Sequence, residues 1–253
     1  MTHDEYSVSM FPLFQQMLQA HFPGALPMGD YMLQTCRHLL KFGFRDENTL
    51  GLVVVCRDEI AEPFVDLVIK YWGKTFDCRS LGGFLLMGKS GIAAATAHAP
   101  IVDGVRRFVL FAMPHIAISK QGEIGTVYRE GIHQASHSCG SLSTVVKELE
   151  SGRINLETDL DDMEQCCVRH KILSAINYGD KLDLLSITHL ACRIIGDDVE
   201  RLLGAVDPST YNYAVLTGIL IHGPADTHWV YPQRCSLVGA HPPREDDAVG
   251  ALQ

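Results

Sequence analysis

Two uninterrupted apolar runs, each followed by polar residues, constrain the fold of this chain more than any other feature. The first covers residues 50–55 and leads into Cys56 and Asp58; the second covers residues 108–113 and leads, through a proline, into His115. Short Val-rich runs of this kind are typical of strands buried on both faces of a parallel sheet. In such sheets ligands bind just outside the carboxyl ends of the strands. The sequence therefore predicts a binding or catalytic site near Cys56.

The rest of the chain alternates between helical and extended patterns. Apolar residues recur at helical spacing in residues 11–21, 29–42, 60–72, 90–97, a segment that begins near 139, 160–177 and 184–204. Extended patterns cover residues 50–55, 75–81, 107–113, 212–221 and 228–238. Strands that alternate with helices are typical of the right-handed crossovers that build a parallel sheet. We therefore expect an α/β fold with a mainly parallel β-sheet flanked by helices.

The length of 253 residues fits one large domain. Residues 46–240 are expected to form this domain, and the helical N-terminal segment 1–45 to pack on it or on a partner subunit. The tail 241–253 begins with one histidine and two prolines and continues with residues of mixed charge, a composition that predicts disorder.

The composition excludes several classes of protein. A formal net charge of −9 without a Lys/Arg run argues against a nucleic-acid surface or binding to an anionic membrane. No apolar stretch has transmembrane length and the N-terminus has no signal-peptide pattern, so we expect a soluble cytoplasmic protein. Eight Cys without disulfide-framework spacing fit a reducing compartment. Because no CxxC pair occurs, a metal site has to be assembled from distant positions.

Cys56, His115 and Cys139 are candidates for a set of metal ligands. His115 follows the second buried run, at the same edge of the predicted sheet as Cys56, and Cys139 stands where a helix is expected to begin. A helix N-terminus lowers the pKa of a thiol, so Cys139 is expected to be a thiolate. Two thiolates and one imidazole with an open fourth position are a known catalytic zinc set. The alternative is that both Cys are buried apolar side chains and that His115 only caps its strand.

Five short motifs carry a resemblance to a known family. Residues 56–59, 80–83, 88–91, 114–118 and 138–142 read Cys-Arg-Asp-Glu, Ser-Leu-Gly-Gly, Gly-Lys-Ser-Gly, Pro-His-Ile-Ala-Ile and Ser-Cys-Gly-Ser-Leu. They resemble motifs of the limiting-CO2-inducible protein B/C family, whose algal and microbial members resemble β-type carbonic anhydrases in fold. The resemblance implies a β-carbonic-anhydrase-like domain with Cys56, His115 and Cys139 as zinc ligands. It also implies that Asp58 is the carboxylate of the Asp–Arg dyad beside the metal.

The arginine of this dyad is not where the β-type pattern puts it. It usually follows the aspartate by two residues, and here that position is Ile60. Arg79, near the end of the second predicted strand, is the first candidate to reach Asp58. Arg57 ranks second because its side chain points away from Asp58 in an extended chain.

A long insert between His115 and Cys139 is a second departure, since β-type enzymes keep these ligands close together. We expect the insert to line or cover the site with Arg129, Glu130, His133 and His137.

The resemblance implies a zinc-dependent carbonic anhydrase, in which zinc-bound hydroxide attacks CO2 to give bicarbonate. It also implies a homodimer, and a chloroplast stroma location if the source is algal. One alternative is a catalytically silent zinc-binding subunit of the same fold that serves in CO2 response or assembly. Another is a cysteine-dependent hydrolase with metal-free Cys139 as the nucleophile.

Overall fold

A large mixed sheet organises the molecule, which is described by a computed structural model over residues 11–129, 131, 134–177, 179–204, 206 and 209–239. The sheet order is β1-β10-β9-β5-β2-β3, with β4 beside β5 and β6 beside β9. The strands are β1 Leu26–Pro27, β2 Leu50–Val55, β3 Thr75–Asp77, β4 Ile101–Val102, β5 Val105–Met113, β6 His115–Ala117, β9 Tyr211–His222 and β10 His228–Val238. Strands β3, β2, β5 and β9 run parallel, as do β6 and β9, whereas β10 and β1 are antiparallel. The expected α/β fold with a mainly parallel sheet is confirmed.

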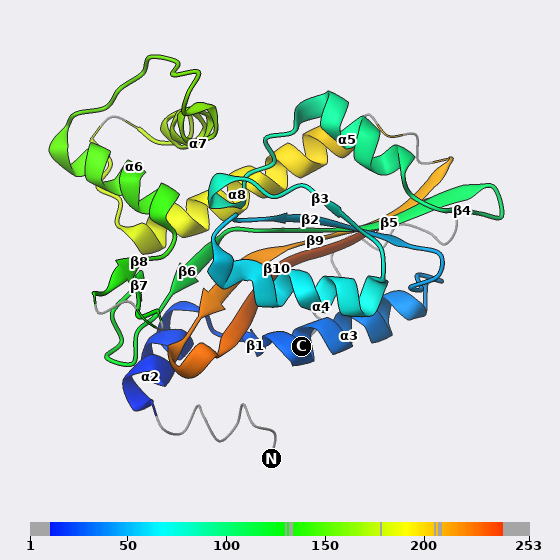
Figure 1. Ribbon diagram of the computed structural model, residues 1–253, viewed down its shortest axis with the longest axis horizontal. Helices are drawn as coiled ribbons and strands as arrows, with labels where there is room; N and C mark the ends of the chain where they lie inside the picture. The colour runs from blue at the N-terminus through cyan, green and yellow to red at the C-terminus, as the bar shows by residue number, and fades with distance from the viewer. Residues whose placement is uncertain are drawn as a thin grey trace.

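Helices cover both faces of this sheet (Figure 1). They are α2 Pro12–His21, α3 Met28–Leu40, α4 Glu62–Trp72, α5 Gly88–Ala97, α6 Gly140–Ser151, α7 Met163–Leu173 and α8 Leu184–Leu203. Side chains of a strand alternate between faces. Accordingly Leu52 and Val54 of β2 join the apolar cluster of α5, α6, α7 and α8, while Val53 and Val55 join that of α3 and α4.

The N-terminal segment contributes to the core. Helix α3 buries Tyr31, Met32 and Leu39 against the sheet, and α2 buries Phe14 and Leu18 in a smaller cluster with the β6 and β9 ends. The boundary at residue 45 stays a prediction, and the tail 241–253 lies outside the described residues. Among the described helices, none combines the length and the apolar character needed to cross a bilayer.

The extended pattern of residues 75–81 ends earlier than expected. Strand β3 stops at Asp77, and the chain turns through the 3-10 helix η2, Leu81–Gly83. Gly82 and Gly83 have φ of 65° and 73°, a region in which a side chain is disfavoured. A Cβ on Gly83 would lie 2.6 Å from the carbonyl oxygen of Met113. The missing side chain therefore allows η2 to rest on the end of β5, next to His115.

Candidate metal centre

The three expected metal ligands meet at one edge of the sheet. Cys56 directly follows β2, His115 opens β6, and Cys139 is the N-cap of α6. All three side chains are buried. The two sulfur atoms are 3.8 Å apart, and the ligand atoms of the three residues lie within 4.8 Å of one another. This cluster has the size and the donor atoms of a metal site.

The orientation of His115 fits the same interpretation. Its Nδ1 is 3.1 Å from the hydroxyl of Ser138, whereas its Nε2 is fully buried and has no hydrogen-bond partner among the described residues. An unsatisfied buried nitrogen costs about 1–3 kcal/mol, so such atoms are rare without a reason. A metal ion bound by Nε2 and two sulfurs would satisfy it, and two thiolates with one imidazole suit zinc.

The two thiols influence each other strongly. A hydrogen bond from Cys139 lowers the pKa of Cys56 to about 4, with a further contribution from His115 and against the effect of burial. The pKa of Cys139 is raised well above its ordinary value, first by Cys56 and then by burial. Backbone amides of α6 lower the pKa of Cys139, as expected of a helix N-terminus, but the neighbouring sulfur outweighs them. The two sulfurs therefore titrate as a pair, in which the first proton is lost easily and the second is held tightly.

Asp58 lies beside this cluster and is paired with an arginine. Its Oδ2 is 3.9 Å from Nε2 of His115, and its Oδ1 accepts a hydrogen bond of 2.8 Å from Nη2 of Arg129. Both side chains are mostly buried, with exposed fractions of 14% for Asp58 and 19% for Arg129. Arg129 belongs to the insert that was expected to line the site. Glu130 and His133 of that insert lie outside the described residues.

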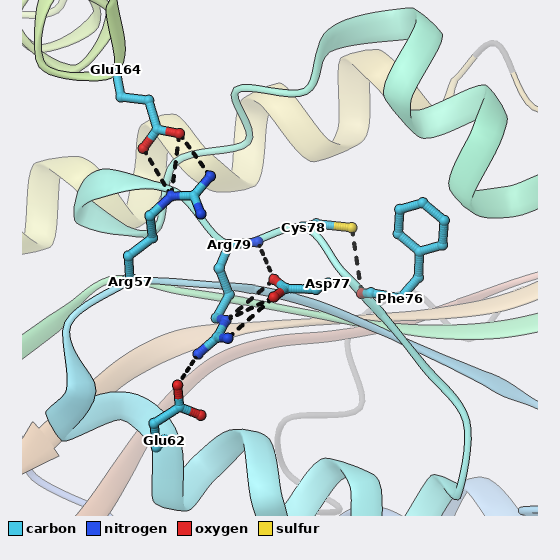
Figure 2. Close-up of polar contacts among 7 residues, drawn as sticks. All are labelled: Arg57, Glu62, Phe76, Asp77, Cys78, Arg79 and Glu164. Atoms are coloured by element: carbon cyan, nitrogen blue, oxygen red, sulfur yellow. Dashed lines mark hydrogen bonds and ion pairs between the residues drawn. The ribbon is translucent and has the colours of Figure 1, made fainter. Parts of the chain in front are cut away.

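The two arginines expected next to Asp58 are engaged elsewhere (Figure 2). Arg79 donates to Asp77 at 3.1 Å and to Glu62 at 2.5 Å. One of these two carboxylates, Asp77, is only two residues away along the chain. Arg57 donates to Glu164 of α7 at 2.9 Å. Both arginines are thus paired with other carboxylates, whereas Asp58 is paired with Arg129.

A large cavity adjoins the cluster. Its volume is about 940 Å³, and its lining includes Glu59, Arg129, His222 and His228. The ring of His222 packs edge-on against that of His115, with centroids 5.2 Å apart. Burial holds the pKa of His222 well below its ordinary value, with help from His115, His228 and Arg129. The cavity thus brings solvent space close to Asp58 and Arg129.

Hydrogen bonds continue from His222 toward the surface. Its Nδ1 is 2.9 Å from Nδ1 of His228, and Nε2 of His228 is 3.0 Å from the exposed carboxylate of Asp226. The sequence patterns did not single out any of these three residues, which lie at the end of β9, at the start of β10 and in the turn between them.

Comparisons with known proteins agree with this fold. The chain superposes on the crystal structure of limiting CO2-inducible protein LCIB with a TM-score of 0.73 and 30% identity, over 90% of this chain and 97% of that one. The crystal structure of PtLCIB4, a homolog of LCIB, superposes with a TM-score of 0.79 and 23% identity, over 92% and 99% of the two chains. Among curated protein sequences no match is found.

A family model describes nearly the whole domain. It is that of the limiting CO2-inducible proteins B/C beta carbonic anhydrases, and it matches residues 25–239. This range includes the Cys56, His115 and Cys139 cluster together with Asp58 and Arg129. The chain therefore belongs to the limiting CO2-inducible protein B/C family of β-carbonic anhydrases.

Proposed function

We propose that the protein is a zinc-dependent carbonic anhydrase that reversibly hydrates CO2 to bicarbonate. The observation that carries the proposal is the buried set of two thiols and one imidazole with the Asp58–Arg129 pair beside it. Cys56, His115 and Cys139 would hold the ion. Zinc in such a set brings the pKa of a bound water to about 7, which makes hydroxide available at neutral pH.

The side chains of this chain supply orientation. Asp58 accepts hydrogen bonds only, as long as it is ionised, and so can fix the direction of a hydroxyl group next to His115. Arg129 donates to Oδ1 of this carboxylate and so fixes its position beside the ligand cluster. Loss of this contact would free Asp58 to approach the cluster, where its carboxylate could itself bind the ion and close the site.

The surroundings suit an apolar substrate. Phe84 and Leu85 are buried in the same apolar cluster as Cys56 and Cys139.

We propose CO2 and bicarbonate as the small-molecule partners and a homodimer as the assembly. The Arg129 contact favours catalysis over the silent zinc subunit, since an Asp58 without an arginine partner would have favoured that alternative.

Two measurements on the purified protein test the proposal. Metal analysis is expected to find one zinc per chain, and stopped-flow hydration of CO2 with a pH indicator is expected to show catalysis. A chelator should abolish the activity, and added zinc should restore it.

The outcomes separate the candidate functions. Stoichiometric zinc without CO2 hydration would support the silent subunit. Metal-free protein with an alkylation-sensitive hydrolase activity would support Cys139 as a nucleophile and overturn the proposal.

A further inference from the structure

Arg129 makes a separate hydrogen bond from each of its three guanidinium nitrogens. Nη2 donates to Asp58, Nε donates to Glu59, and Nη1 donates to Ser136. The guanidinium is planar, so three acceptors in three directions fix both its position and its plane. Only one of the three bonds reaches the residue next to the metal ligands.

Arg129 is carried by a short hairpin. It lies two residues beyond β7, Thr126–Val127, which among the described residues pairs with β8, Ser136–His137, and the base of the hairpin is held by the amide of Gly125, which donates to the carbonyl of Ala117 at 2.7 Å. Ordering a long arginine side chain costs up to about 2 kcal/mol of rotamer entropy. A precise Arg129–Asp58 contact therefore needs help from other side chains.

Glu59 and Ser136 approach the guanidinium from two different segments. Glu59 begins the 3-10 helix η1, Glu59–Ala61, which Asp58 caps by accepting from the amide of Ile60. The adjacent carboxylates of Asp58 and Glu59 thus bind one guanidinium from a single short segment. On the other side, Ser136 also donates to the carbonyl of Val127 at 3.4 Å, which ties its hydroxyl to the hairpin.

We infer that Glu59 and Ser136 are positioning residues that hold Arg129 on Asp58. This inference rests on the proposed function, because it explains how the Asp58–Arg129 pair is maintained for that reaction. Without either residue, the guanidinium is free to turn toward the adjoining cavity, and Asp58 loses its partner for part of the time.

Glu62 provides a matched control. Like Glu59 it is an exposed glutamate near the start of α4, and like Glu59 it binds an arginine, Arg79. Arg79 contacts Asp77 rather than Asp58. Removing the charge of Glu62 therefore changes the same kind of ion pair without touching the Asp58–Arg129 contact.

The experiment combines two readouts on the zinc-loaded protein. The first is the arginine Nε–H signal in ¹H–¹⁵N spectra, with the Arg129 signal assigned by its loss in Arg129→Lys. The second is steady-state CO2 hydration together with zinc content. The variants are Glu59→Gln, Ser136→Ala, Ser136→Thr, which keeps the hydroxyl, and the control Glu62→Gln.

We expect Glu59→Gln and Ser136→Ala to shift and broaden the Arg129 signal. We also expect them to lower kcat about tenfold, with KM within about twofold and zinc content unchanged, because misplacing a catalytic contact by a fraction of an ångström has effects of this order. Ser136→Thr should restore most of kcat, and Glu62→Gln should shift only the Arg79 signal.

Two results would overturn the inference. One is an Arg129 signal and a kcat that do not change in Glu59→Gln and Ser136→Ala; the other is an equal loss of kcat in Glu62→Gln. If the wild-type protein hydrates no CO2, the proposed function fails, and the Arg129 signal alone still decides whether Glu59 and Ser136 position this side chain.

Discussion

The candidate metal ligands and the partner of Asp58 come from two very different parts of the molecule. Cys56, His115 and Cys139 stand at the ends of β2, β5–β6 and the start of α6, and each is at most 3% exposed. Arg129 comes instead from a hairpin of two two-residue strands and reaches Asp58 from 71 residues away. The ligand cluster is fixed by the core of the domain, whereas the Asp58–Arg129 pair depends on side-chain contacts at the surface of the cavity. Metal binding and the orientation of Asp58 should therefore fail separately.

The largest expected effect is the loss of metal from the ligand cluster. Cys56→Ala and Cys139→Ala should each reduce bound zinc from one per chain to near zero, because a two-ligand site cannot hold the ion in a tetrahedral set. Cys78→Ala is the control, since Cys78 is also buried but is not one of the three clustered ligands, and its sulfur donates to the backbone carbonyl of Phe76. The zinc content of each variant is measured after dialysis. Full zinc retention in Cys56→Ala or Cys139→Ala would contradict the assignment of that residue as a zinc ligand.

Next in size is the effect of removing the arginine. Arg129→Ala should lower kcat/KM for CO2 hydration about a hundredfold while zinc stays bound, because Asp58 loses its charge-assisted partner. Arg79→Ala should change kcat/KM by less than about twofold, since its contacts are with Asp77 and Glu62. Stopped-flow kinetics with parallel metal analysis compares the two. A larger loss in Arg79→Ala would show that the comparison between the two arginines is wrong.

The third prediction concerns the free energy of unfolding and tests the contact between η2 and the end of β5. Gly83→Ala should destabilise the fold by about 2–4 kcal/mol, because a positive φ costs about 1–2 kcal/mol and the new Cβ would overlap the Met113 carbonyl. Gly152→Ala is the control: its φ is 64°, and no described atom lies within 4 Å of its Cβ position. Denaturant unfolding of both variants measures the difference. Equal losses would mean that the contact with β5 contributes nothing.

The smallest effect is expected for Arg57→Ala. Arg57 is 57% exposed, and its ion pair with Glu164 is screened by water, so the free energy of unfolding should change by less than about 1 kcal/mol. Zinc content and kcat should stay within error of the wild type. A kinetic defect in this variant would revive Arg57 as a residue of the site.

The ligand cluster and the Asp58–Arg129 pair also differ in how far the sequence predicts them. The apolar runs before Cys56 and His115 identify buried parallel strands, and sheet topology then places their carboxyl ends together, so the ligand cluster could be anticipated. The Asp58–Arg129 contact could not, because two-residue strands such as β7 and β8 carry no periodic pattern. The early end of β3 was missed for another reason: the glycines at 82 and 83 turn the chain, and the pattern before them still looks extended.

Ser138 and Cys139, adjacent in the chain, have two different roles in the ligand cluster. The Ser138 hydroxyl meets Nδ1 of His115, while Cys139 supplies a sulfur to the same cluster. When the hydroxyl accepts the Nδ1 proton, the imidazole is held in the tautomer whose Nε2 lone pair faces the sulfurs. The site is then preorganised: folding, rather than the arriving ion, selects the tautomer and the ring orientation. Zinc association should therefore need no rearrangement of the imidazole.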